Sequence, residues 1–239
     1  MDKMNLDRHI SSQFNDELES VRSQLMEMGG LVEMQVRDAL QAAVNSDSAL
    51  ASKVLTSDVK INNLEMTIDA EVTRIIAKRQ PTAGDLRLML VAMKAIGDLE
   101  RIGDEAQRIA RVALESFSNS QQQDLLGNVD NLGKHVLSVL TDSLDALARM
   151  DMEAAVRIHQ EDKKIDREYE ALLRLLMTYM MEDSRSIPKI LNVMWAVRSL
   201  ERIGDRCQNL LEYIMYMVKG KDMRHTDPDT IEEKLHAKK

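Results

Sequence analysis

The pentapeptide Glu-Arg-Ile-Gly-Asp occurs twice in this chain, at residues 100–104 and again at 201–205. Residues four apart lie on one face of a helix, so each copy presents two carboxylates side by side. A glycine inside a helix costs about 1 kcal/mol relative to alanine, and its use twice at the same place indicates close approach by a neighbouring helix or an ion. The sequence therefore predicts a duplicated helical unit with an acidic pair in each copy.

The repeat extends well beyond the pentapeptide. A shift of 104 residues superimposes 45–62 on 149–166, and after Pro81 and Pro188 the shift becomes 101 residues. A three-residue difference at a proline-bearing junction is typical of a loop that has changed length. We therefore expect two copies of one unit and a polar tail, divided as 7–118, 124–219 and 220–239.

Composition predicts that both units are helical. Only nine Gly and three Pro occur in 239 residues, and aromatic residues make up 3% of the chain, so long helices with few turns are favoured. A hydrophobic content of 44% is enough for the core of one or two domains. We expect an all-α chain of two tandem three-helix bundles related by an approximate twofold axis.

The expected helices follow from apolar periodicity and end signals. The first contains Gly29-Gly30 as a candidate kink, and SNSQQQD (118–124) is the expected connector between the units. The six helices are expected from Phe14 to Val44, from the N-cap Asp47 to Arg79, from a Thr82-Ala-Gly-Asp85 capping box to about Phe117, and then near 125–149, 152–182 and 187–218.

Charge and cysteine content narrow the function classes. A net charge of -8 argues against nucleic acid as the main partner, because neutralising phosphates requires clustered Lys and Arg. The single cysteine allows no intramolecular disulfide, and the first ten residues lack the pattern of a secretory signal, so we expect a reducing, cytoplasmic compartment. No apolar run is long enough for a spanning helix, which leaves peripheral association with a membrane complex open.

No catalytic constellation emerges from the sequence. A carboxylate-bridged metal pair in a helical bundle needs Glu-x-x-His motifs, and neither His135 nor His159 lies three residues after a Glu. There is no G-x-S-x-G motif and no strand to carry a nucleophile elbow. We expect a protein that is not an enzyme.

The acidic pairs lie at the edge of the predicted buried face. On a helical wheel, Glu100 continues the apolar stripe of Met93 and Ile96, and Glu201 continues that of Met194 and Val197. Unpaired carboxylates are costly there. Arginines from neighbouring helices or a bound cation could neutralise them, and both interpretations remain open at this point.

The second helix of each unit offers further oxygen ligands. Asp162 and Asp166 lie four apart, and their counterparts in the first unit are Asp58 and Asn62, so a second carboxylate row could face the first. Salt bridges along the same helix are the alternative. Oxygen ligands suit Mg, Mn or Fe, and the lack of a nearby His or Cys ligand set argues against structural zinc; Cys207 points away from its pair.

The doubled motif, together with RIIAKRQPTAGDLR (74–87), EDKKIDREYE (161–170) and LMTYMMEDSR (176–185), resembles the PhoU family of phosphate-transport regulators from Asp7 to Met223. The resemblance implies two PhoU-type three-helix bundles, pairing into homodimers, and a cytoplasmic, non-enzymatic adaptor. Such an adaptor couples the Pst phosphate transporter and its ATPase to the PhoR sensor kinase, and restrains the phosphate-starvation response when phosphate is plentiful. The metal-binding motif of the family falls on Glu100, Asp104, Glu201 and Asp205.

The two copies differ after the motif. The Asn and Glu usual in the family appear as Asn209 and Glu212 in the second unit, but as Arg108 and Arg111 in the first. On the wheel Arg111 lies about 20° from Glu100 and could itself supply positive charge, whereas Glu212 would add a carboxylate to the second pair. We therefore expect the second site to bind metal more strongly. The alternative is a helical scaffold whose acidic pairs form structural salt bridges and bind no metal.

Overall fold

The computed structural model describes residues 12–114 and 120–220, and the expected polar tail therefore lies outside the described residues except for Gly220. Within those ranges every regular element is a helix, which confirms the all-α prediction. The elements are α1 (Ser12–Asn45), α2 (Ser48–Arg79), α3 (Ala83–Val112), α4 (Ser120–Arg149), α5 (Met152–His159), α6 (Asp162–Glu182), the short 3₁₀ helix η1 (Ser184–Ser186) and α7 (Ile187–Lys219).

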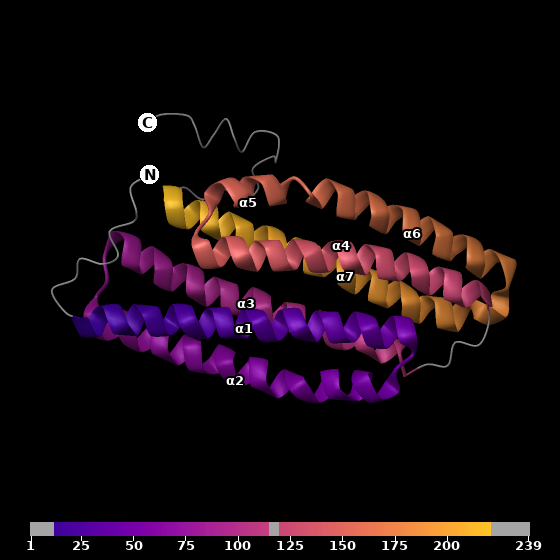
Figure 1. Ribbon diagram of the computed structural model, residues 1–239, viewed down its shortest axis with the longest axis horizontal. Coiled ribbons are helices and arrows are strands. Elements are labelled where there is room, and N and C mark those ends of the chain that lie inside the picture. Colours follow the sequence, from indigo (N-terminus) through magenta and orange to yellow (C-terminus); the bar gives the residue numbers. More distant parts are fainter. Residues whose placement is uncertain (1–11, 115–119, 221–239) are drawn as a thin grey trace.

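The helices form two bundles that share one long interface. Helices α1, α2 and α3 pack together, helices α4 to α7 pack together, and α3 against α7 joins the two groups, with α1 against α4 beside it (Figure 1). Helices α3 and α7 are antiparallel, because Arg87 near the start of α3 lies beside Gly220 at the end of α7. Fully buried side chains such as Met28, Ile109 and Leu140 fill the core.

The first corner of each bundle shows the repeat directly. Ser46 and Met150 both adopt left-handed backbone conformations, with φ of 53° and 50°. In the next position, the Asp47 and Asp151 side chains each accept a hydrogen bond from the backbone N–H three residues ahead, at 2.9 and 3.0 Å. Both are therefore helix N-caps, as predicted for Asp47, and the shift of 104 residues describes the same turn built twice.

The predicted helix over 152–182 is wrong in one respect, because the structure divides it into α5 and α6. At the break, Glu161 N donates to Ile158 O at 2.9 Å and Lys164 N donates to Glu161 O at 2.8 Å. These i to i+3 bonds tighten the backbone and interrupt the α-helical ladder. The corresponding part of α2 is continuous, so the two copies differ here.

Other helix ends also differ from expectation. Helix α4 begins at Ser120, so most of the expected connector 118–124 is helical. Helix α3 ends at Val112 rather than near Phe117, and Phe117 itself lies outside the described residues. Thr82 is the N-cap of α3, but its side chain makes no capping hydrogen bond, so the capping box is not formed. Helix α1 continues through Gly29-Gly30 without interruption.

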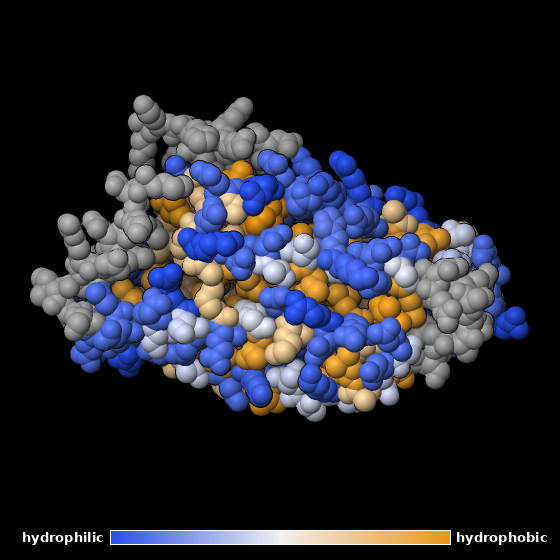
Figure 2. Space-filling model, in the orientation of Figure 1, coloured by the Kyte–Doolittle hydropathy of each residue, from blue (hydrophilic) through white to orange (hydrophobic). Residues whose placement is uncertain are grey.

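The surface is mixed in character. Figure 2 shows hydrophobic residues interspersed among hydrophilic ones over one face of the molecule. The most exposed large apolar side chains include Met181 on α6 and Trp195 on α7, at 79% and 60% of full exposure. None of the helices in the described ranges is long and apolar enough to cross a membrane.

Candidate metal centres

The acidic pair of the first unit faces carboxylates of α2. Glu100 is half-buried on α3, and burial followed by the neighbouring charges of Asp104, Glu65 and Asp58 raises the pKa of its carboxyl. The facing row that the sequence predicted therefore exists in this unit. Glu65 was missed, because a helical glutamate among polar residues carries no distinguishing signal until α3 is placed opposite it.

Two buried amide oxygens beside this first cluster have no hydrogen-bond partner. The buried carboxylate of Asp58 accepts hydrogen bonds from Gln35 Nε2 at 3.3 Å and Asn62 Nδ2 at 3.0 Å. The opposite ends of those amides, Gln35 Oε1 and Asn62 Oδ1, lack a donor. A buried acceptor without a donor is costly, and a cation would satisfy it.

Gly103 makes this arrangement possible. A Cβ atom at this position would lie 2.9 Å from Gln35 Oε1 and 3.3 Å from Asp58 Oδ1. The close approach that the sequence predicted at the pentapeptide glycine is therefore found in the first copy. At Gly204 the nearest atoms would be those of Ile165, at 3.4 and 3.5 Å, which is ordinary van der Waals contact.

The second unit brings α6 and α7 together in the same way. Burial, then the charges of Asp166 and Asp205, raise the pKa of the Asp162 carboxyl to about 6. Burial and Asp205 raise the pKa of Glu201, and burial and Asp166 raise the pKa of Asp205. Burial and neighbouring carboxylates thus raise the pKa of three carboxyls, those of Asp162, Glu201 and Asp205, and a bound cation would relieve this repulsion.

A buried amide also lies beside the second cluster. The Gln208 side chain is close enough to Asp162 to lower the pKa of that carboxyl slightly, against the effect of burial. Gln208 is buried, and neither Nε2 nor Oε1 of its side chain has a hydrogen-bond partner of standard geometry. Sequence reasoning missed Gln208, since an isolated glutamine on a helix usually faces solvent.

Arg111 and Glu212 do not lie beside the acidic pairs as the helical wheel predicted. Each of these residues lies eleven positions after the first motif carboxylate, which is about 16 Å along the helix axis. The Glu212 carboxylate lies instead 3.9 Å from Nε2 of the buried His159 on α5, and Arg111 lines a pocket between α3 and α7. A helical wheel gives direction around the axis and ignores distance along it.

The arginines expected by the salt-bridge interpretation do not contact the clusters. Arg101, Arg198 and Arg202 are near enough to lower the pKa of Glu100 or Glu201 slightly. Within residues 12–114 and 120–220, however, no Lys or Arg forms a salt bridge with the following carboxylates: Asp58, Glu100, Asp104, Asp162, Asp166, Glu201 and Asp205.

The donor set suits a hard cation. Both clusters combine carboxylate oxygens with buried amide oxygens, which are ligands that suit Mg and Mn. No three His, Cys, Asp or Glu side chains in the described part of the chain already lie close enough together to hold a metal ion.

The paired helical units correspond to a known family. A family model described as the PhoU domain matches the chain twice, over residues 25–113 and 129–214. The chain belongs to the PhoU family. It is 56% identical over 238 residues to the phosphate-specific transport system accessory protein PhoU of Escherichia coli (strain K12), covering 100% of this chain and 98% of that protein.

Solved PhoU structures have the same fold. The crystal structure of PhoU from Pseudomonas aeruginosa superposes with a TM-score of 0.81 at 48% identity, covering 87% of this chain and 100% of that one. The phosphate transport system regulatory protein PhoU from Streptococcus pneumoniae gives a TM-score of 0.79 at 29% identity, covering 88% and 99%. The names of these relatives describe accessory and regulatory proteins rather than enzymes, and the resemblance noted from the sequence is confirmed.

Proposed function

We propose that this protein is an accessory regulator of phosphate transport that works as a metal-binding adaptor. Its partners are the ATPase of the Pst transporter and the PhoR sensor kinase, and it restrains the phosphate-starvation response when phosphate is plentiful. The names of the E. coli and S. pneumoniae relatives support the role in phosphate transport. The protein acts by contact, on the cytoplasmic side of a membrane complex and as a homodimer.

The observation that carries the metal part is the pair of carboxylate clusters without salt-bridge partners. In each unit, carboxylates on the middle helix face the motif pair on the last helix, and burial and mutual repulsion raise the pKa of Glu100, Glu201 and Asp205. Unneutralised acidic clusters lower stability. Bound Mg, Mn or Fe would compensate for that cost and lock the two helices together.

The regulatory part is tested by deleting the gene and following a phosphatase reporter in phosphate-rich medium. Reporter output is expected to rise and to return to its low level on complementation with the intact gene. Complementation with the double variant Glu201→Ala and Asp205→Ala separates the regulatory role from metal binding. If this variant restores repression, regulation does not need the second metal cluster.

The contact part is tested by copurification from cells grown in high and in low phosphate. The transporter ATPase or the sensor kinase is expected with the tagged protein, and added salt should weaken the contact if exposed charges dominate it. Unchanged reporter output together with no copurifying component would leave a helical scaffold as the better description. Chelation is the simplest separate test, because a scaffold without metal keeps its melting temperature.

A further inference from the structure

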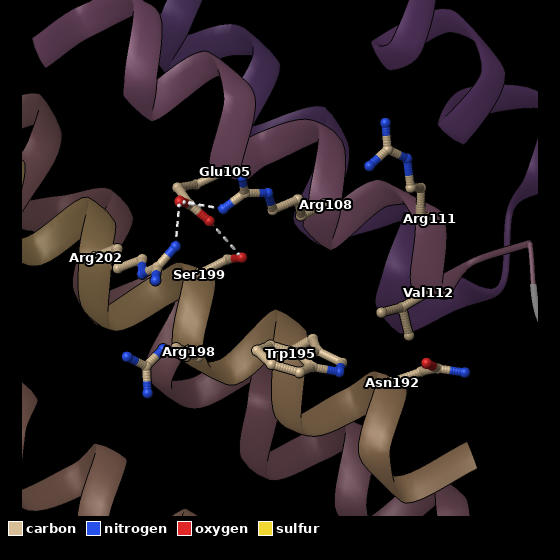
Figure 3. A pocket seen from close by; sticks show the side chains of 9 residues that line it. All are labelled: Glu105, Arg108, Arg111, Val112, Asn192, Trp195, Arg198, Ser199 and Arg202. Carbon is tan, nitrogen blue, oxygen red and sulfur yellow. Dashed lines mark hydrogen bonds and ion pairs between the residues drawn. The ribbon is translucent and has the colours of Figure 1, made fainter. Parts of the chain in front are cut away.

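A pocket of about 460 Å³ lies between α3 and α7, and no carboxylate of either acidic cluster lines it (Figure 3). Its volume is in the range of small-molecule sites. Four arginines line it, Arg108 and Arg111 from α3 and Arg198 and Arg202 from α7. In a chain with a net charge of -8, this concentration of positive charge is a marked local exception.

The four arginines fall into two kinds. Glu105, the one carboxylate in the lining, is buried and holds Arg108 Nη1 at 2.7 Å and Arg202 Nη1 at 3.2 Å. Arg111 and Arg198 are exposed, and within the described ranges neither side chain forms a hydrogen bond or an ion pair. Four guanidinium groups and one carboxylate leave a net lining charge of +3, with two cations available to a ligand. Such a lining attracts a multiply charged anion.

The pocket also presents an aromatic face. Trp195 is 60% exposed and is the only tryptophan in the chain. Figure 3 shows its ring on α7 between Arg198 and Asn192, below Arg108 and Arg111 of α3. An exposed indole next to guanidinium groups is a stacking platform for a planar ring such as a nucleobase.

The internal repeat provides a comparison within the molecule. A shift of 101 residues pairs Trp195 with Lys94 and Val112 with Tyr213. At the counterpart position the Tyr213 ring lies 5.7 Å from Lys94 Nζ, and its hydroxyl binds Asp98. That space is occupied by the tyrosine, whereas Val112 is too small to fill the equivalent space beside Trp195. The open pocket is therefore a feature of one side of the interface and not a consequence of the duplication.

We propose that this pocket binds a nucleoside di- or triphosphate, with the base stacked on Trp195 and the phosphates held by the arginines, of which Arg111 and Arg198 can turn toward the ligand. The cationic lining alone would suit inorganic phosphate, and the exposed ring alone would suit any aromatic group. Their combination in a cavity of this size favours a ligand that carries both. The inference does not depend on the proposed role in phosphate transport.

The test uses the tryptophan as its own reporter. The purified full-length protein is titrated with ADP in excess chelator, so that metal at the acidic clusters cannot carry the nucleotide, and Trp195 fluorescence is followed. We expect saturable quenching, with adenosine and inorganic pyrophosphate each binding about tenfold or more weakly. The double variant Arg111→Ala and Arg198→Ala should weaken ADP binding by about tenfold or more, whereas Arg174→Ala, which removes an exposed arginine on α6, should not.

Three results would overturn the proposal. One is the absence of saturable quenching by ADP together with no ADP-dependent rise in melting temperature. Another is equal affinity for pyrophosphate and ADP, which would describe a simple anion site. The third is ADP binding that survives in the double arginine variant, which would remove the nucleotide from this pocket.

Discussion

The Tyr213 hydroxyl of α7 donates a 2.7 Å hydrogen bond to Asp98 of α3, a buried carboxylate that also accepts from Arg206 and Asn209 at 3.1 Å. One acidic side chain of the first bundle is therefore satisfied entirely by the second. A shift of 101 residues relates Asp98 to Ser199, whose hydroxyl donates to the buried Glu105 at 2.7 Å. The two bundles thus exchange polar contacts at equivalent places along their shared interface.

This relationship predicts that Tyr213→Phe lowers the free energy of unfolding by about 1.5 kcal/mol, because the change removes a hydrogen bond to a buried charge. Tyr179→Phe is the matched control, since no hydrogen bond of the Tyr179 hydroxyl occurs within the described residues, and it should change stability by less than about 0.5 kcal/mol. Urea denaturation followed by circular dichroism measures both. Equal effects would show that the Asp98 contact contributes no net stability.

The two pentapeptide glycines should respond differently to alanine. Gly204→Ala should raise the free energy of unfolding by up to about 1 kcal/mol, because the new methyl group has ordinary contacts and alanine favours helix. Gly103→Ala should show no such gain, because its methyl group would displace the Gln35 amide from Asp58. Thermal unfolding of the Gly103→Ala and Gly204→Ala proteins measures the difference. Equal stability of the two variants would contradict this prediction.

The second carboxylate cluster makes the metal-free protein sensitive to pH. Asp162 has a folded-state pKa of about 6, above its ordinary value of 3.8, so the folded state binds this proton more readily. Ionising Asp162 in the folded state lowers the free energy of unfolding. This loss is absent below about pH 4, grows between about pH 4 and pH 6, and is complete above about pH 6. Because solvent screens this half-buried carboxylate in part, Asp162→Asn should raise the free energy of unfolding at pH 7.5 by about 1–2 kcal/mol, with little effect at pH 4.

Denaturant titrations at the two pH values, in excess chelator, measure this effect. Asp145→Asn, which changes an exposed carboxylate on α4, is the control and should show no such pH-dependent gain. A destabilised Asp162→Asn protein at pH 7.5 would mean that the carboxylate is a structural partner rather than an electrostatic cost.

Metal content should depend on both acidic pairs, and more on the second. Replacing Glu201 and Asp205 by Ala should reduce bound Mn or Fe more than the same change at Glu100 and Asp104, because burial and neighbouring carboxylates raise the pKa of three carboxyls in the second cluster, those of Asp162, Glu201 and Asp205. In the first cluster, Asp58 already accepts two amide hydrogen bonds. Elemental analysis of the purified proteins provides the measurement. Equal metal content in the wild type and both variants would indicate that the acidic clusters have a structural role and do not bind metal.

The sequence predicted most of the architecture because duplication leaves local signals. The N-cap aspartates, the helix periods and the repeated pentapeptide all report on residues within a few turns of one another. The break between α5 and α6 escaped prediction, because i to i+3 bonding around Glu161 involves residues that are individually compatible with helix. The start of α4 was placed five residues late for a similar reason, since its Gln-rich beginning resembles a connector.

In the candidate metal centres too, the sequence predicted residues that share one helix face and missed those contributed by a neighbouring helix. The motif carboxylates and the facing Asp58, Asp162 and Asp166 were found from spacing, because residues four apart on a helix share a face. Glu65, Gln208 and Gln35 were not found, since they join the clusters only when a second helix packs against their own. Arg111 and Glu212 were misplaced because angle on a wheel was used without distance along the axis.

The sequence by itself determined the helical class, the duplication and the two acidic pairs, since each is encoded in short-range spacing. Only the tertiary structure decided which surfaces meet. The antiparallel packing of α3 on α7 buries Asp98 and Glu105 against the opposite bundle and opens the arginine and tryptophan pocket on one side alone. These features depend on pairs of residues about one hundred positions apart, and such contacts are set by the fit of whole helices rather than by any local pattern.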